Sequence, residues 1–155
     1  MLRIARLLGK GCHATLVSAN AHAQRLAGLG LQAIPDRITD AGPLGGLDAL
    51  AAACGTPWLL TMPVDVVDGN DGLLHTLMQA GNIGAVAEDD GGLQPLVALY
   101  RVDALRDALV HAIAAGDYSV RAMQALLRLP RVHLTGVRFG NLNTPDDLRA
   151  AGIDS

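Results

Sequence analysis

The chain has 155 residues, about the length of one domain, and half of them are hydrophobic, whereas aromatic residues make up only 3%. The formal net charge is −3 at pH 7, and Lys10 is the only lysine among 12 basic residues. The shortage of aromatic stacking platforms and of a basic patch argues against nucleic acid, and against an anionic membrane surface, as a partner.

The N-terminal segment and the two cysteines indicate the compartment. Residues 1–10 form an apolar stretch that is too short and too interrupted for a signal peptide or a membrane span. Cys12 and Cys54 form no C-x-x-C pair and indicate no disulfide framework, so buried free thiols are expected. We therefore expect a cytoplasmic protein.

Helical and extended patterns alternate along most of the chain. Apolar spacing, glycine stops and capping residues predict helices over 1–8, 21–29, 42–53, 70–80, 102–115, 120–129 and from Thr144 onward. Apolar and β-branched runs predict strands over 13–18, 31–35, 58–62, 85–88, 94–100 and 131–135. The alternation predicts an α/β fold with a mainly parallel sheet, and no linker divides the chain, so residues 1–155 form one domain.

Local capping and turn signals sharpen these boundaries. Asn20 and Ser119 are expected to cap the helices that follow them. Pro43 suits the first turn of a helix, where its missing N–H costs no hydrogen bond. The turn residues 89–92 separate two short strands and favour a hairpin.

The apolar run 58–62 ends in Pro63, and Asp65 follows two residues later. A buried strand here would place Asp65 at the carboxyl edge of the sheet, where open α/β folds bind ligands. A carboxylate at that edge suits a hard cation such as Mg²⁺, which prefers oxygen ligands and often bridges to phosphates. The alternative is that Asp65 only caps the next helix or solvates a turn.

Other polar and small residues also follow predicted strands. Asp36 ends the second strand, and the glycines of 42–46 open a helix whose free N–H groups could meet an anion or a base edge. Asn143 could bond a phosphate, a metal-bound water or the backbone. The alternatives are structural: glycines that allow close packing, asparagines that hold turns, and Gln94 satisfying a strand end.

Taken in order, six motifs resemble one family. They are Ser18-Ala19-Asn20, Pro35-Asp36-Arg37, Gly42-Pro43-Leu44-Gly45-Gly46, Pro63-Val64-Asp65, the Gln94–Arg101 segment and the Asn141–Leu148 segment. The ordered set resembles the molybdenum cofactor guanylyltransferases, which are nucleotidyltransferases with a three-layer Rossmann-like fold. The resemblance implies that GMP is moved from GTP onto molybdopterin, with Mg²⁺ as cofactor and pyrophosphate as the second product.

The same resemblance implies roles for individual residues. Asp65 matches the metal-binding and catalytic aspartate, with Val64 in place of the usual cysteine, and Asn143 matches a second active-site residue. The residues implied to bind the nucleotide are Asp36, Gly42, Pro43, Leu44, Gly45 and Asp65. The residues implied to bind the pterin substrate, or to lie beside it, are Gln94, Arg101 and Asn141.

The chain departs from the family pattern at its start. It shows no first strand with the loop Leu-Ala-Gly-Gly-x-Ser-x-Arg-Met-Gly-x-Asp-Lys, so the sequence reads as N-terminally truncated relative to the family. That strand is central in the family's sheet. We therefore expect either that strand 13–18 closes directly on strand 58–62, or that a partner chain fills the gap, as in a homodimer.

Two other functions stay open at the level of sequence. The first is a non-catalytic remnant that binds a nucleotide or a pterin. The difference from the family's glycine-rich phosphate loop favours this alternative. The second is a cytidylyl- or sugar-nucleotide transferase, which would share the scaffold but fits the Gln-Pro-Leu and Asn-x-Asn-Thr-Pro segments less well.

Overall fold

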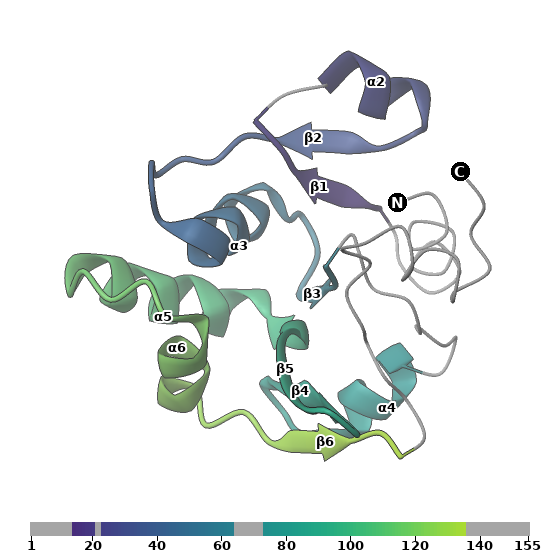
Figure 1. Ribbon diagram of the computed structural model, residues 1–155, viewed down its shortest axis with the longest axis vertical. Helices are drawn as coiled ribbons and strands as arrows, with labels where there is room; N and C mark the ends of the chain where they lie inside the picture. Colours follow the sequence, from purple (N-terminus) through teal and green to yellow (C-terminus); the bar gives the residue numbers. More distant parts are fainter. Residues whose placement is uncertain (1–13, 21–22, 64–72, 136–155) are drawn as a thin grey trace.

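Two β-sheets with five helices around them make up the described part of the chain (Figure 1). The computed structural model describes residues 14–20, 23–63 and 73–135. The helices are α2 (Ala23–Gly28), α3 (Gly42–Ala53), α4 (Leu73–Ala80), α5 (Val102–Ala114) and α6 (Val120–Leu126). The strands are β1 (Leu16–Ser18), β2 (Gln32–Ile34), β3 (Trp58–Thr61), β4 (Gly84–Asp89), β5 (Gly92–Arg101) and β6 (Arg131–His133).

The strand pairings are mixed in direction. β1 and β2 pair in parallel, whereas the larger sheet has the order β3-β5-β4-β6 with β5 antiparallel to both neighbours and β6 parallel to β4. The α/β class is confirmed, but the sheet is mixed where the sequence predicted a mainly parallel one. The physical reason is the predicted β4–β5 hairpin, because its tight turn forces antiparallel pairing and inserts β5 next to β3.

The larger sheet carries a hydrophobic core on each face. On one face, α3, α5 and α6 pack against Tyr100 and Val86, and on the other α4 packs against Val97 and Leu99 (Figure 1). Tyr100, Val97 and Leu99 are no more than 1% exposed. This pattern follows from the period of two along a strand, which sends neighbouring side chains of β5 to opposite faces.

Helix α3 joins the two sheets, because it contacts β1 and β2 as well as α5. Its sequence is apolar nearly all round, which is typical of a helix covered on more than one side. Leu44 and Leu47 belong to the core beneath the larger sheet. Pro43 lies in the first turn, as predicted.

Within the described residues, β1 and β3 do not pair with each other. β1 hydrogen-bonds to β2, and β3 hydrogen-bonds to β5. The prediction that strand 13–18 closes directly on strand 58–62 is therefore wrong. The reason is a cavity between them, which side chains of β1 and the residues at the end of β3 both line. A partner chain in this position stays a prediction.

Several local predictions are borne out. The Ser119 hydroxyl accepts a hydrogen bond from the backbone N–H of Ala122 at 3.2 Å, so it caps α6 as expected. Cys54 is free but only partly buried, with its sulfur 3.3 Å from the Thr56 hydroxyl. The predicted helices over 1–8 and from Thr144 lie outside the described residues, as does Cys12.

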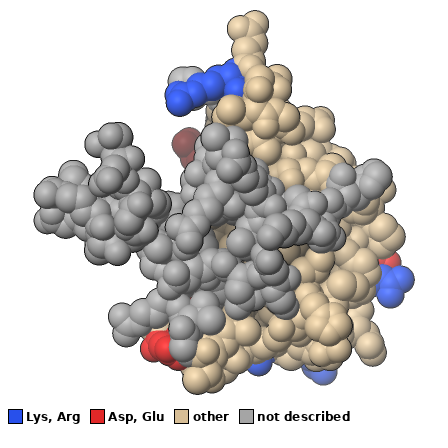
Figure 2. Space-filling model, turned by 90° about the vertical axis from the view of Figure 1, so that its right-hand side faces the viewer, with Lys and Arg blue, Asp and Glu red and all other residues tan. Residues whose placement is uncertain are grey.

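The described surface carries few charges on the face seen in Figure 2, where isolated acidic and basic side chains stand among uncharged residues. No blue patch is visible among the described residues of that face. In the same described ranges, no helix has both the length and the apolar character needed to cross a membrane.

Candidate functional site

A cavity of about 280 Å³ lies where β1, α3, the end of β3 and residues 95–100 of β5 meet. Its lining combines the predicted nucleotide segment with apolar residues from the larger sheet. The lining residues are Thr15, Leu16, Val17, Ser18, Leu31, Asp36, Gly42, Pro43, Gly46, Leu47, Leu50, Thr61, Met62, Pro63, Pro95, Leu96 and Tyr100. The site therefore spans both sheets.

The polar end of the cavity is built where the parallel strands β1 and β2 end. The Ser18 hydroxyl donates to Asp36 Oδ1 at 3.2 Å, and Asn20 Oδ1 accepts the backbone N–H of Asp36 at 2.8 Å. Parallel strands finish at the same edge, which is why residues 16 to 18 positions apart meet here. These contacts orient the Asp36 carboxylate and leave it further capacity to accept hydrogen bonds.

The start of α3 faces the same end. Gly42 has φ +58°, a left-handed conformation that favours glycine, and no side chain caps the helix at Ala41. The first N–H groups of a helix lack partners within it, so an uncapped start offers donors to an acceptor. A carboxylate acceptor and backbone donors thus stand side by side.

Gly46 sets how closely α3 approaches β1. A Cβ added at Gly46 would lie 2.7 Å from the Ser18 hydroxyl oxygen, closer than such atoms come without displacement. The glycine therefore lets Ser18 keep its bond to Asp36 while the helix stays against the strand. Nearby, Arg37 Nε lies 3.6 Å from a carboxylate oxygen of Asp48 on α3, which ties the β2–α3 loop to the helix.

The other end of the cavity is apolar. Met62 and Pro63 come from the end of β3, and Pro95 and Leu96 come from an irregularity in β5. Tyr100 forms part of the lining while being 1% exposed. Burial raises the pKa of the Tyr100 hydroxyl to about 12, although a hydrogen bond from Gln124 acts in the lowering direction. The phenol is therefore neutral at ordinary pH.

The predicted nucleotide residues divide into two groups. Asp36, Gly42 and Pro43 line the cavity. Leu44 is fully buried in the core beneath the larger sheet, and Gly45 is buried against Ala41. Neither Leu44 nor Gly45 lines the cavity, but Gly45 stays next to its polar end, because a Cβ added there would lie 3.8 Å from Asp36 Oδ2.

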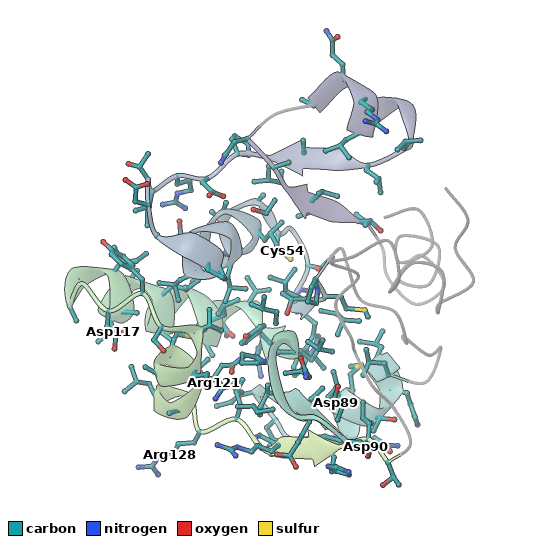
Figure 3. The ribbon with its side chains drawn as sticks, viewed as in Figure 1. Cys54, Asp89, Asp90, Asp117, Arg121 and Arg128 are labelled. Carbon is teal, nitrogen blue, oxygen red and sulfur yellow. The ribbon has the colours of Figure 1, made fainter. Side chains whose placement is uncertain are left out.

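The predicted pterin residues are not brought to this cavity. Gln94 donates to Asp89 Oδ2 at 3.2 Å, and Figure 3 shows Asp89 at the β4–β5 turn, near β6. Arg101 is at the other end of β5, with Nε 3.3 Å from Asp103. Gln94 and Arg101 are seven positions apart on β5, which corresponds to at most about 23 Å at about 3.3 Å per residue. Neither residue lines the cavity.

Three of the residues predicted from the sequence, Asp65, Asn141 and Asn143, lie outside the described residues. Among the described residues, one carboxylate, Asp36, lines the cavity, and these residues include no group of three or more His, Cys, Asp or Glu side chains suited to a metal ion. Mg²⁺ is commonly held by one or two carboxylates together with substrate phosphates. Asp36 is the carboxylate that the described part of the lining offers for such a role.

Sequence reasoning missed the apolar wall and the residues behind it. The side chains of this wall have no chemical feature that marks them as part of a site in the sequence. They belong to Thr61, Met62, Pro95, Leu96 and Tyr100. Asn20 was expected to cap a helix, and its contact with Asp36 depends on strand pairing that no local pattern reveals.

The chain is similar to known nucleotidyltransferases over most of its length. Residues 1–132 match the MobA-like NTP transferase domain. The chain is 36% identical over 153 residues to the molybdenum cofactor guanylyltransferase of Cereibacter sphaeroides, covering 96% of this chain and 78% of that protein. The molybdopterin-guanine dinucleotide biosynthesis protein A of Archaeoglobus fulgidus superposes with a TM-score of 0.68 at 24% identity, covering 97% of this chain and 83% of that one.

A second solved structure also shares the fold. The 2-C-methyl-D-erythritol 4-phosphate cytidylyltransferase of Thermus thermophilus has a TM-score of 0.71 at 17% identity, covering 97% of this chain and 87% of that chain. The Rossmann-like nucleotidyltransferase architecture is therefore shared with enzymes of different base preference.

Proposed function

Because the chain belongs to the MobA-like NTP transferase domain family, we propose that it binds GTP and transfers its GMP moiety to molybdopterin, releasing pyrophosphate. The curated relative that matches over 96% of this chain is a molybdenum cofactor guanylyltransferase, which supports this choice of nucleotide and acceptor. The structural observation that carries the proposal is the pairing of the Asp36 carboxylate with the uncapped start of α3 at one end of the cavity.

This pairing suits the polar edge of guanine. Guanine presents ring and exocyclic N–H donors beside the acceptor O6. The Asp36 carboxylate would accept from the donors, and backbone N–H groups at the start of α3 would donate to O6. Adenine and cytosine place an unprotonated ring nitrogen where guanine has a donor, so the same carboxylate would repel them. The cavity therefore favours GTP over ATP and CTP.

The apolar end of the cavity would contribute to binding the rest of the nucleotide mainly by excluding water, and less by hydrogen bonding. Met62, Pro63, Pro95 and Leu96 offer no charge to a phosphate. We assign the phosphates to the segment after Pro63, where Asp65 follows in sequence and would hold Mg²⁺. When bound, Mg²⁺ neutralises phosphate charge, on which nucleotidyl transfer depends together with positioning.

The roles of the other residues follow from the family resemblance. Asn143 would act beside Asp65 at the reacting phosphate, and Asn141, Gln94 and Arg101 would meet the pterin. A homodimer and a cytoplasmic location also belong to the proposal. Of these residues, only Gln94 and Arg101 are described, and both lie outside the cavity. An acceptor extending along β5 would be needed to reach either one.

Calorimetric titration with GTP and Mg²⁺, repeated with CTP, tests the proposal. We expect saturable binding that is selective for GTP in the wild type. D36N should weaken GTP binding by about 10-fold or more, since a charged hydrogen-bond acceptor contributes about 1.5–3 kcal/mol. D40N is the matched control, because Asp40 is exposed in the same loop but does not line the cavity. Equal affinities of D36N and D40N would contradict the guanine assignment.

Turnover is measured separately as pyrophosphate released from GTP in the presence of molybdopterin. Release that requires both substrates supports transfer by this chain. Selective GTP binding without release would instead support the non-catalytic nucleotide-binding function that the sequence leaves open.

A further inference from the structure

Strand β5 contains an irregularity that reshapes the wall of the cavity. Ala87 of β4 pairs with Gln94, and the preceding Val86 pairs with Ala98, so residues 95–97 of β5 have no counterpart on β4. Such bulges bend a strand and redirect side chains, and proline is tolerated there because it has no N–H for the ladder. Pro95 and Leu96 of this bulge both line the cavity.

One buried side chain on α6 ties this bulge in place. Gln124 is 4% exposed, and its Nε2 group donates to the Pro95 carbonyl oxygen at 2.7 Å and to the Tyr100 hydroxyl oxygen at 2.6 Å. Both N–H donors of the amide are thereby used. Pro95 begins the bulge and Tyr100 follows it, so one amide group spans the irregular segment.

The chemistry of these contacts requires an amide. The Pro95 carbonyl can only accept, so the NH₂ end of Gln124 must face it, which settles the orientation of the side chain. A carboxylate in the same place would set two acceptors against each other. Gln124 Oε1 is buried and has no hydrogen-bond partner among the described residues. The orientation of the amide therefore rests on its two donor contacts.

Gln124 itself does not line the cavity, whereas both of its partners do. We propose that Gln124 is a positioning residue that sets the cavity wall formed by Pro95, Leu96 and Tyr100, and through it the affinity for the nucleotide. The inference rests on the proposed function only for the choice of GTP as the probe. The alternative is that Gln124 merely satisfies polar groups in the core and affects stability alone.

The test compares Q124M with a matched glutamine variant, Q79M. Methionine keeps the length of the side chain and removes both donors. Gln79 lies exposed on α4, where its amide contacts His75, and it has no part in the cavity. Calorimetry with GTP and Mg²⁺ should show the dissociation constant of Q124M raised about 10-fold, and that of Q79M within about twofold of the wild type.

A second variant guards against failure of Q124M to fold. Y100F keeps the buried ring and removes only one of the two acceptors, so we expect a smaller rise in the GTP dissociation constant, about two- to threefold. The exposed Tyr118 supplies its control as Y118F. If folded Q124M and Y100F bind GTP like their controls while their unfolding midpoints fall, Gln124 is structural only and the inference is overturned.

A ligand-free measurement separates this inference from the proposed function. The amide resonances and hydrogen-exchange rates of Leu96 and Val97 should change in Q124M and stay at wild-type values in Q79M. Unchanged Leu96 and Val97 amides in Q124M would refute positioning, whatever GTP does. If these amides change in Q124M but the wild-type protein does not bind GTP, the positioning of the cavity wall is supported. The assignment of GTP as the ligand is then refuted.

Discussion

Strands β4 and β5 of the larger sheet are buried more deeply than the two strands of the smaller sheet. In the larger sheet, Val97, Leu99 and Ala85 are 0% exposed, whereas every residue of β1 and β2 is partly buried or exposed. The smaller sheet and the residues that follow it nevertheless supply Ser18 and Asp36 to the cavity, and the larger sheet and its flanks supply Pro95, Leu96 and Tyr100. The candidate site thus lies at a boundary between a firmly packed frame and a lightly packed one, as is common where ligands bind.

Truncating one leucine in each sheet tests this comparison most directly. L99A should lower the free energy of unfolding by about 2–5 kcal/mol, because it opens a cavity in a fully packed core. L16A, at a partly buried position beside the existing cavity, should cost only about 1 kcal/mol. Urea denaturation of both variants is the measurement. Equal losses would show that the two sheets are equally well packed.

Alkaline unfolding probes the packed face around Tyr100. Its pKa is raised from 10.0 to about 12 in the folded protein. Between these values the unfolded chain loses the phenol proton while the folded chain keeps it, so stability falls as pH rises from 10 to 12. The loss approaches about 2–3 kcal/mol at pH 12, since one pKa unit is worth about 1.4 kcal/mol.

The variant Y100F isolates this effect. It should remove that part of the stability loss between pH 10 and 12, whereas Y118F should keep it, because Tyr118 is exposed. Guanidinium denaturation at pH 9 and pH 11.5 gives the difference. If the free energy of unfolding fell equally between pH 9 and pH 11.5 in both variants, Tyr100 would not retain its proton more strongly in the folded protein than in the unfolded chain.

Arg106 tests how the helix between the sheets is held. From α5, its Nε donates to the carbonyl of Ala51 and its Nη2 to the carbonyl of Cys54, each at 2.9 Å. These carbonyls belong to the end of α3, where helical partners are missing. R106M should therefore cost about 1–2 kcal/mol in urea denaturation.

The control for this variant is R121M on α6, and Figure 3 labels Arg121. Arg121 is exposed, and its side chain makes no hydrogen bond or ion pair with the described residues, so R121M should change stability by less than about 0.5 kcal/mol. A cost in R106M no larger than in R121M would show that α3 needs no anchor from α5.

The smallest expected effect concerns the contact between α3 and the smaller sheet. Replacing glycine with alanine within a helix usually gains about 0.5–1 kcal/mol. In G46A, the new Cβ displaces the Ser18 hydroxyl from Asp36, so we expect no net gain. In S18A/G46A that conflict is absent, and the double variant should be more stable than S18A by the full increment. Thermal or urea unfolding of the wild type, G46A, S18A and S18A/G46A measures these differences. If the change from Gly46 to alanine altered the free energy of unfolding equally in the wild-type and S18A backgrounds, the steric conflict would be ruled out.

Much of the local structure follows from the sequence because its causes are local. The Ser119 cap, the hairpin turn at 89–92 and the helix 42–53 each depend on residues within one or two turns, and each is found as predicted. The motif order also leads to the correct family, since each motif is short and continuous.

The tertiary structure alone decides which of these pieces form a site. It brings Ser18 and Asn20 to Asp36 through strand pairing, and it sends Gln94 and Arg101 to opposite ends of β5. Among the described residues, it pairs β1 with β2 and β3 with β5, so that β1 and β3 line a cavity instead of pairing with each other. A sequence pattern records what each strand prefers, but pairing partners, bulges and buried contacts such as that of Gln124 are settled by packing among segments far apart in the chain.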